Sequence, residues 1–186
     1  MATTPVMKMT RPWTPELLPE VQRIIEEFIL TRRGAKRVLE VGSGWSTIWF
    51  ALMGVDLHSC EHDEDWFGEV SNVLRSLNVP QENYDIVNGH QMDWWVSQEP
   101  IKKFDLVLID CVDEQRLSCL FASLTKVKDD GWIVVDDSHW DMFKAVPDVM
   151  YEMGYIQRVI HGEHVRKTGE KKYHETSIYT KGTFDV

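Results

Sequence analysis

Apolar segments short enough to be strands alternate with segments of helical spacing along most of this chain. Alternation of this kind is typical of a parallel sheet with helices on both faces. A chain of 186 residues is long enough to bury a core of its own and usually forms one domain. We therefore predict a single α/β domain over residues 1–186. The expected strands are 37–41, 56–60, 84–87, 104–109 and 131–135, and the expected helices include 63–77, 119–127 and 142–153.

Both ends of the chain add elements to this core. Residues 1–33 contain several prolines and then apolar residues at helical spacing, which predicts an arm and an amphipathic helix that Thr14 caps and Gly34 ends. In the remaining residues, 34–186, strand-like runs at 155–162 and 175–181 flank a polar loop and predict a closing hairpin with one antiparallel strand. The complete prediction is a doubly wound, Rossmann-like sheet of seven strands, mostly parallel, with helices on both faces.

Composition excludes several classes of partner. A net charge of −10 argues against nucleic acid, because nucleic-acid binding depends on Lys and Arg neutralising phosphates. No apolar run has the length of a signal peptide or a membrane span, so we expect no membrane partner. The three cysteines lack zinc-type spacing and do not suggest a disulfide framework, which favours a cytoplasmic location. A small-molecule substrate fits this composition best.

A glycine turn follows the first expected strand, in the sequence V-L-E-V-G-S-G-W-S-T at 38–47. A strand, a Gly-x-Gly turn and a helix N-terminus place backbone N–H groups and a positive dipole end beside a ligand. Glu61 ends the next strand, where a carboxylate can bind both hydroxyls of a ribose. An NAD enzyme would also meet this pattern, but Thr47 stands where a dinucleotide fingerprint has its third glycine, and a pyrophosphate would crowd Glu40. A carboxylate at Glu40 suits the ammonium and sulfonium of S-adenosyl-L-methionine instead.

On these motifs the sequence resembles the class I S-adenosylmethionine-dependent methyltransferases. The resemblance covers 38–181 and rests on E-V-G-S-G, H-S-C-E-H, N-G-H-Q-M-D, F-D-L-V-L-I-D, G-W-I-V-V-D-D and the terminal hairpin. It implies that the glycine turn and Glu40 hold the methionine part of the cofactor, Glu61 the ribose, and His62 one side of the adenine. Gln91 and Met92 are implied to lie along the adenine edge. The alternative explanation involves no ligand: Gly42 and Gly44 then serve only a tight turn, and His62 and Met92 are ordinary packing residues. The candidate cofactor residues are Glu40, Gly42, Ser43, Gly44, Ser46, Thr47, Glu61, His62, Gln91, Met92 and Asp110.

Aspartates follow two neighbouring expected strands: Asp110 comes after 104–109, and Asp136 and Asp137 come after 131–135. In a doubly wound sheet these carboxylates converge at the ligand-binding edge. Two carboxylates ~4 Å apart repel by roughly 4 kcal/mol at an effective dielectric near ~20, so the cluster takes up a proton, separates or holds a cation. Oxygen ligands select Mg²⁺ or Ca²⁺.

The same arrangement is similar to the metal-dependent O-methyltransferases of the catechol and macrocin types. In those enzymes the ion binds two substrate oxygens and lowers the pKa of the one to be methylated. The resemblance implies that Asp110, Asp136 and Asp137 bind Mg²⁺ or another oxygen-preferring cation. Helix capping by the Asp pair and hydrogen bonding by Asp110 are the alternative explanation.

The general base is less clearly marked. Catechol-type enzymes carry a lysine three residues after the first metal ligand, and Asp113 stands at that place here. His139, two residues beyond the Asp pair, can accept a hydroxyl proton near neutral pH, and with Asp110 it forms the candidate catalytic set. A histidine after a strand is otherwise an ordinary loop residue.

Two further groups are interpreted as surface features. H-G-E-H at 161–164, with His174 nearby, lies on a strand and loop rather than on one helix face, so we interpret it as a solvated hairpin and not as a metal site. The basic residues at its tip are interpreted as a surface loop, with contact to an acidic substrate group as the alternative. Trp45 and Trp140 adjoin the candidate site residues and predict an aromatic wall suited to a flat acceptor.

The sequence therefore predicts divalent-metal-assisted O-methylation of a small-molecule hydroxyl. A metal-independent methyltransferase acting on a small molecule or protein is the first alternative, and a non-catalytic module that binds the cofactor is the second. An RNA 2′-O-methyltransferase would need a lysine where Asp136 stands. The acceptor is not identified by any residue pattern, and formation of a homo-oligomer stays open.

Overall fold

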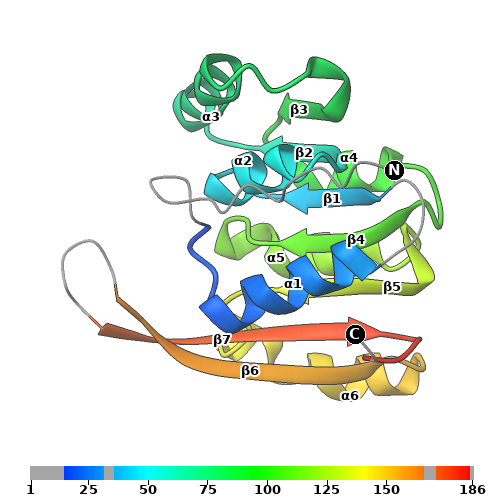
Figure 1. Cartoon of the computed structure of the whole chain (residues 1–186). Coiled ribbons are helices and arrows are strands. Elements are labelled where there is room, and N and C mark those ends of the chain that lie inside the picture. Colours follow the sequence, from blue (N-terminus) through cyan, green and yellow to red (C-terminus); the bar gives the residue numbers. More distant parts are fainter. Residues whose placement is uncertain (1–14, 32–35, 166–170, 185–186) are drawn as a thin grey trace.

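A seven-stranded sheet with the order β3-β2-β1-β4-β5-β7-β6 forms the centre of the molecule (Figure 1). The structure is a computed structural model that describes residues 15–31, 36–165 and 171–184. The first five strands are parallel, and β7 runs antiparallel to both β5 and β6. This order confirms the predicted doubly wound sheet with a C-terminal antiparallel hairpin. The strands are β1 Arg37–Val41, β2 Asp56–Glu61, β3 Tyr84–Asn88, β4 Phe104–Ile109, β5 Val127–Val135, β6 Ile156–Val165 and β7 Lys171–Thr180.

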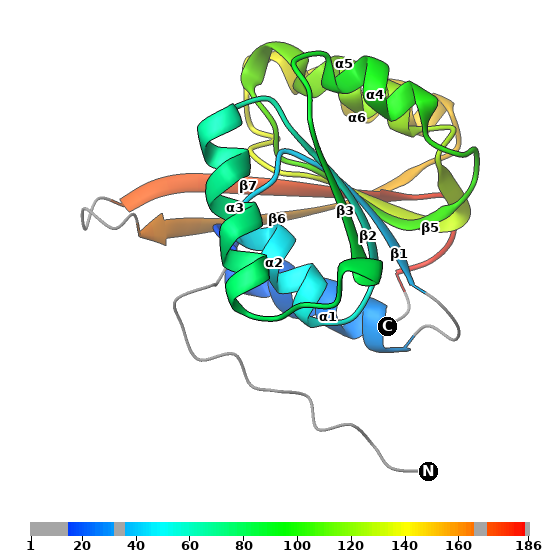
Figure 2. The ribbon, with the colours of Figure 1, turned by 90° about the horizontal axis from the view of Figure 1, so that it is seen from above.

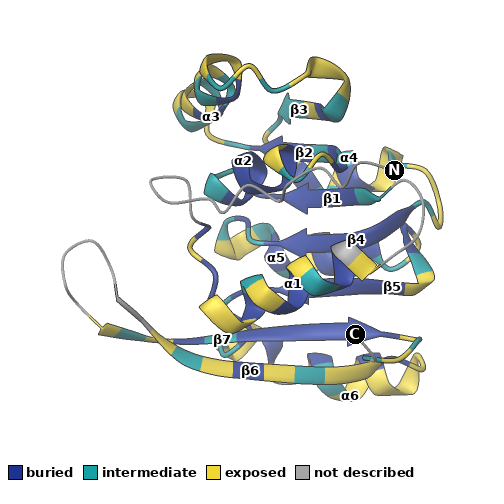
Figure 3. Cartoon of the chain, viewed as in Figure 1, coloured by how far each residue is buried: buried dark blue, intermediate teal, exposed yellow. Residues whose placement is uncertain are grey.

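Among the described residues, three α-helices cover each face of the sheet (Figure 2). Successive residues of a strand point to opposite faces, so Val38 packs with the helices of one side and Leu39 with those of the other. The central strands are buried on both faces, which explains why they are mostly apolar, whereas much of β6 is exposed (Figure 3). One face carries α1 Pro19–Thr31, α2 Trp45–Leu52 and α3 Glu64–Ser76, and the other carries α4 Met92–Gln98, α5 Asp113–Ser123 and α6 Val146–Glu152.

Some predicted boundaries are wrong. The first helix begins at Pro19, a residue whose fixed backbone angle suits a first helical turn, and the proposed caps Thr14 and Gly34 lie outside the described residues. The helix expected at 119–127 is α5, which already ends at Ser123. Residue 127 begins β5, whose charged segment at 128–130 hides the strand pattern.

The C-terminal elements also differ from the prediction. The helix expected at 142–153 is divided into the short 3₁₀ helix η2 Asp141–Phe143 and α6, and a second 3₁₀ helix, η1 Gln81–Asn83, precedes β3. Residues 171–174 were expected in a loop but pair with 162–165 as strand, so the hairpin arms are longer than the prediction. Within the described ranges, no helix is both long and apolar enough to cross a bilayer.

The order in which strands are added to the sheet reverses between β1 and β4, and the carboxyl ends of these strands and their neighbours meet at this edge. In open α/β sheets, ligands bind where the strand order reverses. Here Gly42 follows β1, Asp110 follows β4 and Asp136 follows β5, and Glu61 is the last residue of β2. The fold therefore gathers most of the predicted site residues at one edge.

We predict that Phe28→Ala lowers the free energy of unfolding by roughly 3 to 5 kcal/mol, because it removes a buried aromatic contact. Phe28 is 2% exposed on α1, and its ring stacks on Trp132 of β5 with centroids 3.9 Å apart. The control is Phe121→Ala, since Phe121 on α5 is 40% exposed, and we expect it to change stability by less than about 0.5 kcal/mol. Urea denaturation measures both variants, and equal losses would contradict this role of Phe28.

Candidate functional site

The turn after β1 is closed by a backbone approach that only glycine permits. Gly42 has a φ of 97°, and a Cβ at this position would overlap the carbonyl oxygen of Asp110 at the end of β4. The Gly42 N–H donates to the carbonyl of Cys60 on β2 at 2.9 Å. The turn is thus fixed between β2 and β4, directly before the N-terminus of α2.

Side chains below the turn hold it in this shape. Thr47, in the first turn of α2, accepts a hydrogen bond from the Gly44 N–H at 2.7 Å. Its own hydroxyl donates to Glu40 Oε2 at 2.6 Å. From α3, the indole N–H of Trp66 donates to the carbonyl of Ser43 at 2.7 Å. These bonds leave the backbone of the turn preorganised for a ligand at the start of α2.

Glu40 is a fully buried carboxylate beneath the turn. Its Oε2 accepts hydrogen bonds from Thr47 and Ser59, whereas its Oε1 is buried and has no hydrogen-bond partner among the described residues. Burial raises the pKa of Glu40 from 4.5 to about 7, although the hydroxyls of Ser46, Thr47 and Ser59 act in the opposite direction. A buried acceptor of this kind fits a ligand that brings N–H donors or a positive charge.

A cavity of about 610 Å³ opens over the turn, a volume suited to a nucleoside-sized ligand. Glu61 lies at its wall, and the Oε1 of this carboxylate accepts the N–H groups of His62 and Asp63 at 2.9 Å each. Those bonds fix the orientation of Glu61 at the end of β2. The predicted cofactor residues that line the cavity are Gly42, Ser43, Gly44, Ser46, Glu61, His62 and Asp110, while Glu40 and Thr47 lie buried below them.

The structure does not bring Gln91 and Met92 to this cavity. Met92 is fully buried in the core beneath α4 and α5, so its side chain packs against other apolar residues. Gln91 is exposed and lines a separate cavity of about 510 Å³. Their expected contact with adenine therefore has no support in the observed cavity.

Arg116, on α5, lies among the predicted metal ligands and was missed in the sequence. It is 4% exposed and donates to the carbonyl of Cys111 at 2.6 Å and to that of Asp136 at 2.6 Å. Its Nη2 also lies 3.1 Å from Asp110 Oδ1, and the guanidinium stacks over the ring of Trp140. Desolvation and the negative charge of Asp136 raise the pKa of Asp110, while Arg116 counteracts them. Asp110 is thus already paired with a fixed cation.

Asp136 is bonded to two residues of β7. His174 Nε2 lies 2.9 Å from both carboxylate oxygens, and the hydroxyl of Thr176 donates to Oδ1 at 2.6 Å. Burial lowers the pKa of His174, but the hydrogen bond to Asp136 and the neighbouring carboxylates outweigh this and raise it. His174 is only 7% exposed, so the interpretation of this histidine as part of a solvated hairpin is wrong. His161, by contrast, is exposed as expected.

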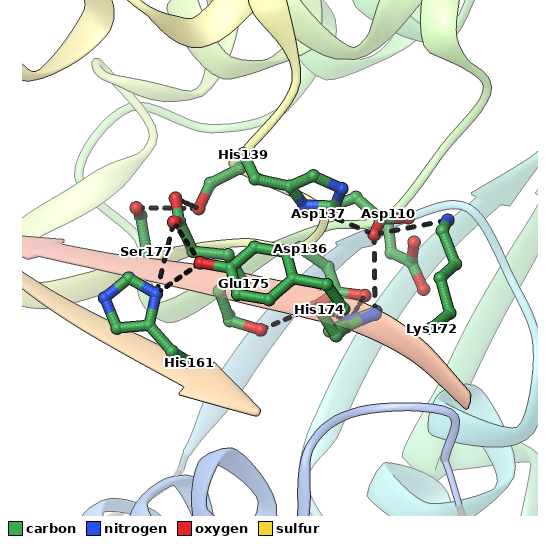
Figure 4. Close-up of polar contacts among 12 residues, drawn as sticks. Asp110, Asp136, Asp137, His139, His161, Lys172, His174, Glu175 and Ser177 are labelled. Atoms are coloured by element: carbon green, nitrogen blue, oxygen red, sulfur yellow. Dashed lines mark hydrogen bonds and ion pairs between the residues drawn. The ribbon is translucent and has the colours of Figure 1, made fainter. Parts of the chain in front are cut away.

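Asp137 has a left-handed backbone, with a φ of 53°, and its side chain points into the cluster shown in Figure 4. Its Oδ1 is buried without a hydrogen-bond partner among the described residues, and so is Nδ1 of His139, 3.8 Å away. The ligand atoms of Asp136, Asp137 and His174 lie within 4.8 Å of one another. We call these three residues the aspartate–histidine cluster. Asp110 is not part of it within the described chain.

Comparison with known proteins agrees with this geometry. A family model described as a methyltransferase domain matches residues 39–138, which contain the glycine turn, Glu61 and all three aspartates. No curated protein sequence matches the chain at a significant level.

Several solved structures share the fold. The O-methyltransferase TomG from Streptomyces achromogenes, solved in complex with SAM, is 18% identical with a TM-score of 0.66, over 89% of this chain and 80% of that chain. A precorrin-6y C5,15-methyltransferase from Geobacter metallireducens is 14% identical with a TM-score of 0.67, over 97% and 94% of the two chains. A candidate O-methyltransferase from Klebsiella pneumoniae is 19% identical with a TM-score of 0.67, over 96% and 84%. The TM-scores establish a common fold, which by itself does not select an acceptor.

We predict that Glu40→Gln gains stability relative to the unchanged protein as the pH rises from 5 to about 8. The unfolded carboxyl ionises near 4.5 but the folded one only near 7, so the unchanged protein loses stability across this interval. The loss levels off above pH 7 at about 3 kcal/mol, the free energy of this pKa difference. Unfolding curves in urea across this pH range, without added ligand, measure it. Glu82→Gln, at an exposed position in η1, is the control, and equal pH profiles for the Glu40→Gln and unchanged proteins would refute the argument.

Proposed function

Because the chain belongs to the methyltransferase-domain family and is an S-adenosylmethionine-dependent methyltransferase, we propose that it methylates a hydroxyl group of a small molecule. The observation that carries the proposal is the cavity over the glycine turn. The residues proposed to bind the cofactor, Glu61 among them, line this cavity, and Asp110 lines it too. Arg116 connects Asp110 to Asp136, so the proposed cofactor site continues directly into the aspartates.

We propose that the residues lining the cavity, together with Glu40 buried below them, each bind a different part of the cofactor. The unpartnered Oε1 of Glu40 suits the ammonium group, and the backbone N–H groups at the start of α2 suit the carboxylate. Glu61 is proposed to bind the ribose hydroxyls, and His62 to flank the adenine. When bound, the cofactor supplies a methyl group on a sulfonium, which an acceptor oxygen can attack.

We propose His139 as the residue that takes the proton of the acceptor hydroxyl. Its Nδ1 faces Asp137 Oδ1 at 3.8 Å, so a carboxylate can orient the imidazole while the other ring nitrogen acts as base. Trp45 lines the cavity and offers a flat apolar wall, which favours a ring-shaped acceptor. The proposed acceptors are therefore hydroxylated rings, with catechols and sugars as the first to be tried.

A divalent cation is proposed to assist the transfer by binding acceptor oxygens and lowering the pKa of the reacting hydroxyl. The carboxylate-only set predicted from the sequence fits such an ion less well than expected, because Asp110 faces Arg116 at 3.1 Å. Asp136 and Asp137 are still close enough to share an ion.

Metal-independent transfer is the second candidate, and one observation favours it. Two cationic side chains already face the aspartates: Arg116 lies beside Asp110, and Lys172 Nζ lies 3.8 Å from Asp137 Oδ1. In this alternative the positive charges of Arg116 and Lys172 neutralise the carboxylates in place of a metal ion, and His139 alone activates the hydroxyl. Metal titration separates the two candidates.

We predict that S-adenosylhomocysteine, the product form of the cofactor, binds the protein and that Glu61→Gln weakens the binding about tenfold or more. The expected loss is that of a hydrogen bond to a charged group, about 1.5 to 3 kcal/mol. Isothermal calorimetry measures both proteins, with Glu82→Gln as the control of equal charge change. Absence of binding to the unchanged protein would refute the proposed cofactor site, and unchanged affinity in Glu61→Gln would remove Glu61 from it.

We predict that His139→Ala lowers turnover by roughly 10² to 10⁴, the usual contribution of a general base. The assay follows transfer of a labelled methyl group from S-adenosylmethionine to a panel of catechols, phenols and sugars. Binding of S-adenosylhomocysteine should stay within about twofold of the unchanged protein. His90→Ala serves as control, because His90 is exposed and lines the separate cavity beside Gln91. Full turnover by His139→Ala would exclude His139 from the mechanism.

A further inference from the structure

The orientation of the His139 imidazole depends on packing, because its buried Nδ1 makes no hydrogen bond within the described residues. Asp137 Oδ1, at 3.8 Å, is too far away to accept one. The loop that carries His139 is well fixed, since the Ser138 N–H donates to the carbonyl of Glu175 at 2.9 Å and the Ser138 hydroxyl donates to Glu175 Oε1 at 2.9 Å. The backbone is therefore anchored to β7, but the rotation of the imidazole depends on the rings around it.

Tyr173 of β7 supplies one of these rings. It meets the imidazole of His139 edge to face, with ring centroids 5.4 Å apart and ring planes at 87°. Trp140, the next residue along the loop, makes a wider contact at 6.2 Å and 70°. Aromatic rings prefer edge-to-face contacts with centroids about 4.5 to 7 Å apart. Because Tyr173 comes from a strand and not from the loop, it can hold the imidazole against a separate support.

Tyr173 is itself held in place, although it is 51% exposed. Its hydroxyl donates to Glu175 Oε2 at 3.2 Å, and the hydroxyl oxygen lies 2.7 Å from Nδ1 of His161 on β6. The positions of His161 and Glu175 can be followed in Figure 4. The strand register explains this arrangement, because His161 pairs with Glu175 and Tyr173 lies two residues away on the same face of β7. An exposed side chain ordinarily changes rotamer freely, whereas this one has two partners on the hairpin.

Tyr173 is distinct from the aspartate–histidine cluster. Its sequence neighbours Lys172 and His174 point to the opposite face of β7, since successive residues of a strand alternate. There Lys172 faces Asp137 and His174 is bonded to Asp136. The hairpin therefore contributes to this edge from both of its faces.

We propose that Tyr173 is a positioning residue, whose ring holds the imidazole of His139 in the orientation in which it takes the acceptor proton. The inference rests on the proposed function, because His139 acts as a base only in that reaction. A general base must lie within hydrogen-bond reach of the proton it removes, and a small misplacement can cost about a hundredfold in rate. Tyr173 acts through His139, because its own hydroxyl is engaged by His161 and Glu175.

The first test is the turnover of three variants, measured with labelled S-adenosylmethionine and the panel of acceptors. Tyr173→Ala removes the ring and should lower kcat about tenfold to a hundredfold, while KM for S-adenosylmethionine stays within about twofold. Tyr173→Phe and His161→Ala both keep the ring and both remove the hydrogen bond between these residues, so they should lower kcat to a similar and smaller extent. Tyr151→Ala, which changes an exposed tyrosine on α6, is the control and should leave kcat unchanged.

A double variant distinguishes positioning from a general structural role. His139→Ala combined with Tyr173→Ala should be no slower than His139→Ala alone, because Tyr173 then has no imidazole left to position. A loss in the double variant equal to the product of the two single losses would overturn the inference, since Tyr173 would then act independently of His139.

The second test needs no methyl transfer. Nuclear magnetic resonance of protein labelled at histidine gives an order parameter for each imidazole. Tyr173→Ala should lower that of His139 and leave that of the exposed His90 unchanged, and Tyr173→Phe should lower that of His139 less. Thermal unfolding of every variant shows that it is folded. An unchanged order parameter of His139 in Tyr173→Ala would overturn the inference.

The outcomes separate this inference from the proposed function. Full turnover by Tyr173→Ala, beside the expected loss in His139→Ala, refutes the inference alone. Full turnover by His139→Ala refutes the proposed base and the inference with it. If no compound of the panel is methylated while Tyr173→Ala loosens the imidazole of His139, the proposed acceptors are wrong and the positioning contact is supported.

Discussion

Arg116 is the residue on which the functional edge of the sheet depends. It is almost completely buried, and its guanidinium binds the carbonyl of Cys111, the carbonyl of Asp136 and the side chain of Asp110. These acceptors follow β4 and β5, so one side chain fixes the ends of two neighbouring strands. Its positive charge also offsets part of the repulsion among the aspartates, which would be severe in a buried site.

The position of Arg116 divides this edge into two halves. On one side, the turn after β1 and Glu61 on β2 surround the cavity assigned to the cofactor. On the other side, Asp136 and Asp137 follow β5 and meet His174 on β7. The antiparallel hairpin is what completes the second half, because it returns residues from the end of the chain to the sheet. The division gives the proposed cofactor site and the proposed acceptor site separate sets of residues.

The sequence predicts the features that depend on local pattern. Apolar runs identify the central strands, and the glycine spacing identifies the turn, whose Gly42 is required by its contact with Asp110. The sequence does not identify Arg116, because an arginine in an amphipathic helix ordinarily faces solvent. Its role depends on how α5 packs against the ends of β4 and β5.

His174 was misassigned for a related reason. Its burial follows from the register in which β7 pairs with β5, where Val135 opposes Ser177 and Thr176 reaches Asp136. That register is a long-range property, and charged neighbours such as Lys172 made the segment look like an exposed loop. The position of His174 directly before the predicted strand 175–181 was the available indication, and it was weak. Met92 is the opposite case. The motif matched it to a contact with the cofactor, but its side chain is fully buried in the core.

The central claim is that the two halves of this edge bind different groups on either side of Arg116. The most direct measurement is a crystal structure of the protein grown with S-adenosylhomocysteine and Mn²⁺, with anomalous diffraction used to locate the metal. We expect the nucleoside to contact Glu61 over the glycine turn and the anomalous peak to lie against Asp136 and Asp137, with Arg116 still bonded to Asp110. A metal bound by Asp110 after displacement of Arg116, or a nucleoside outside the cavity, would contradict the account.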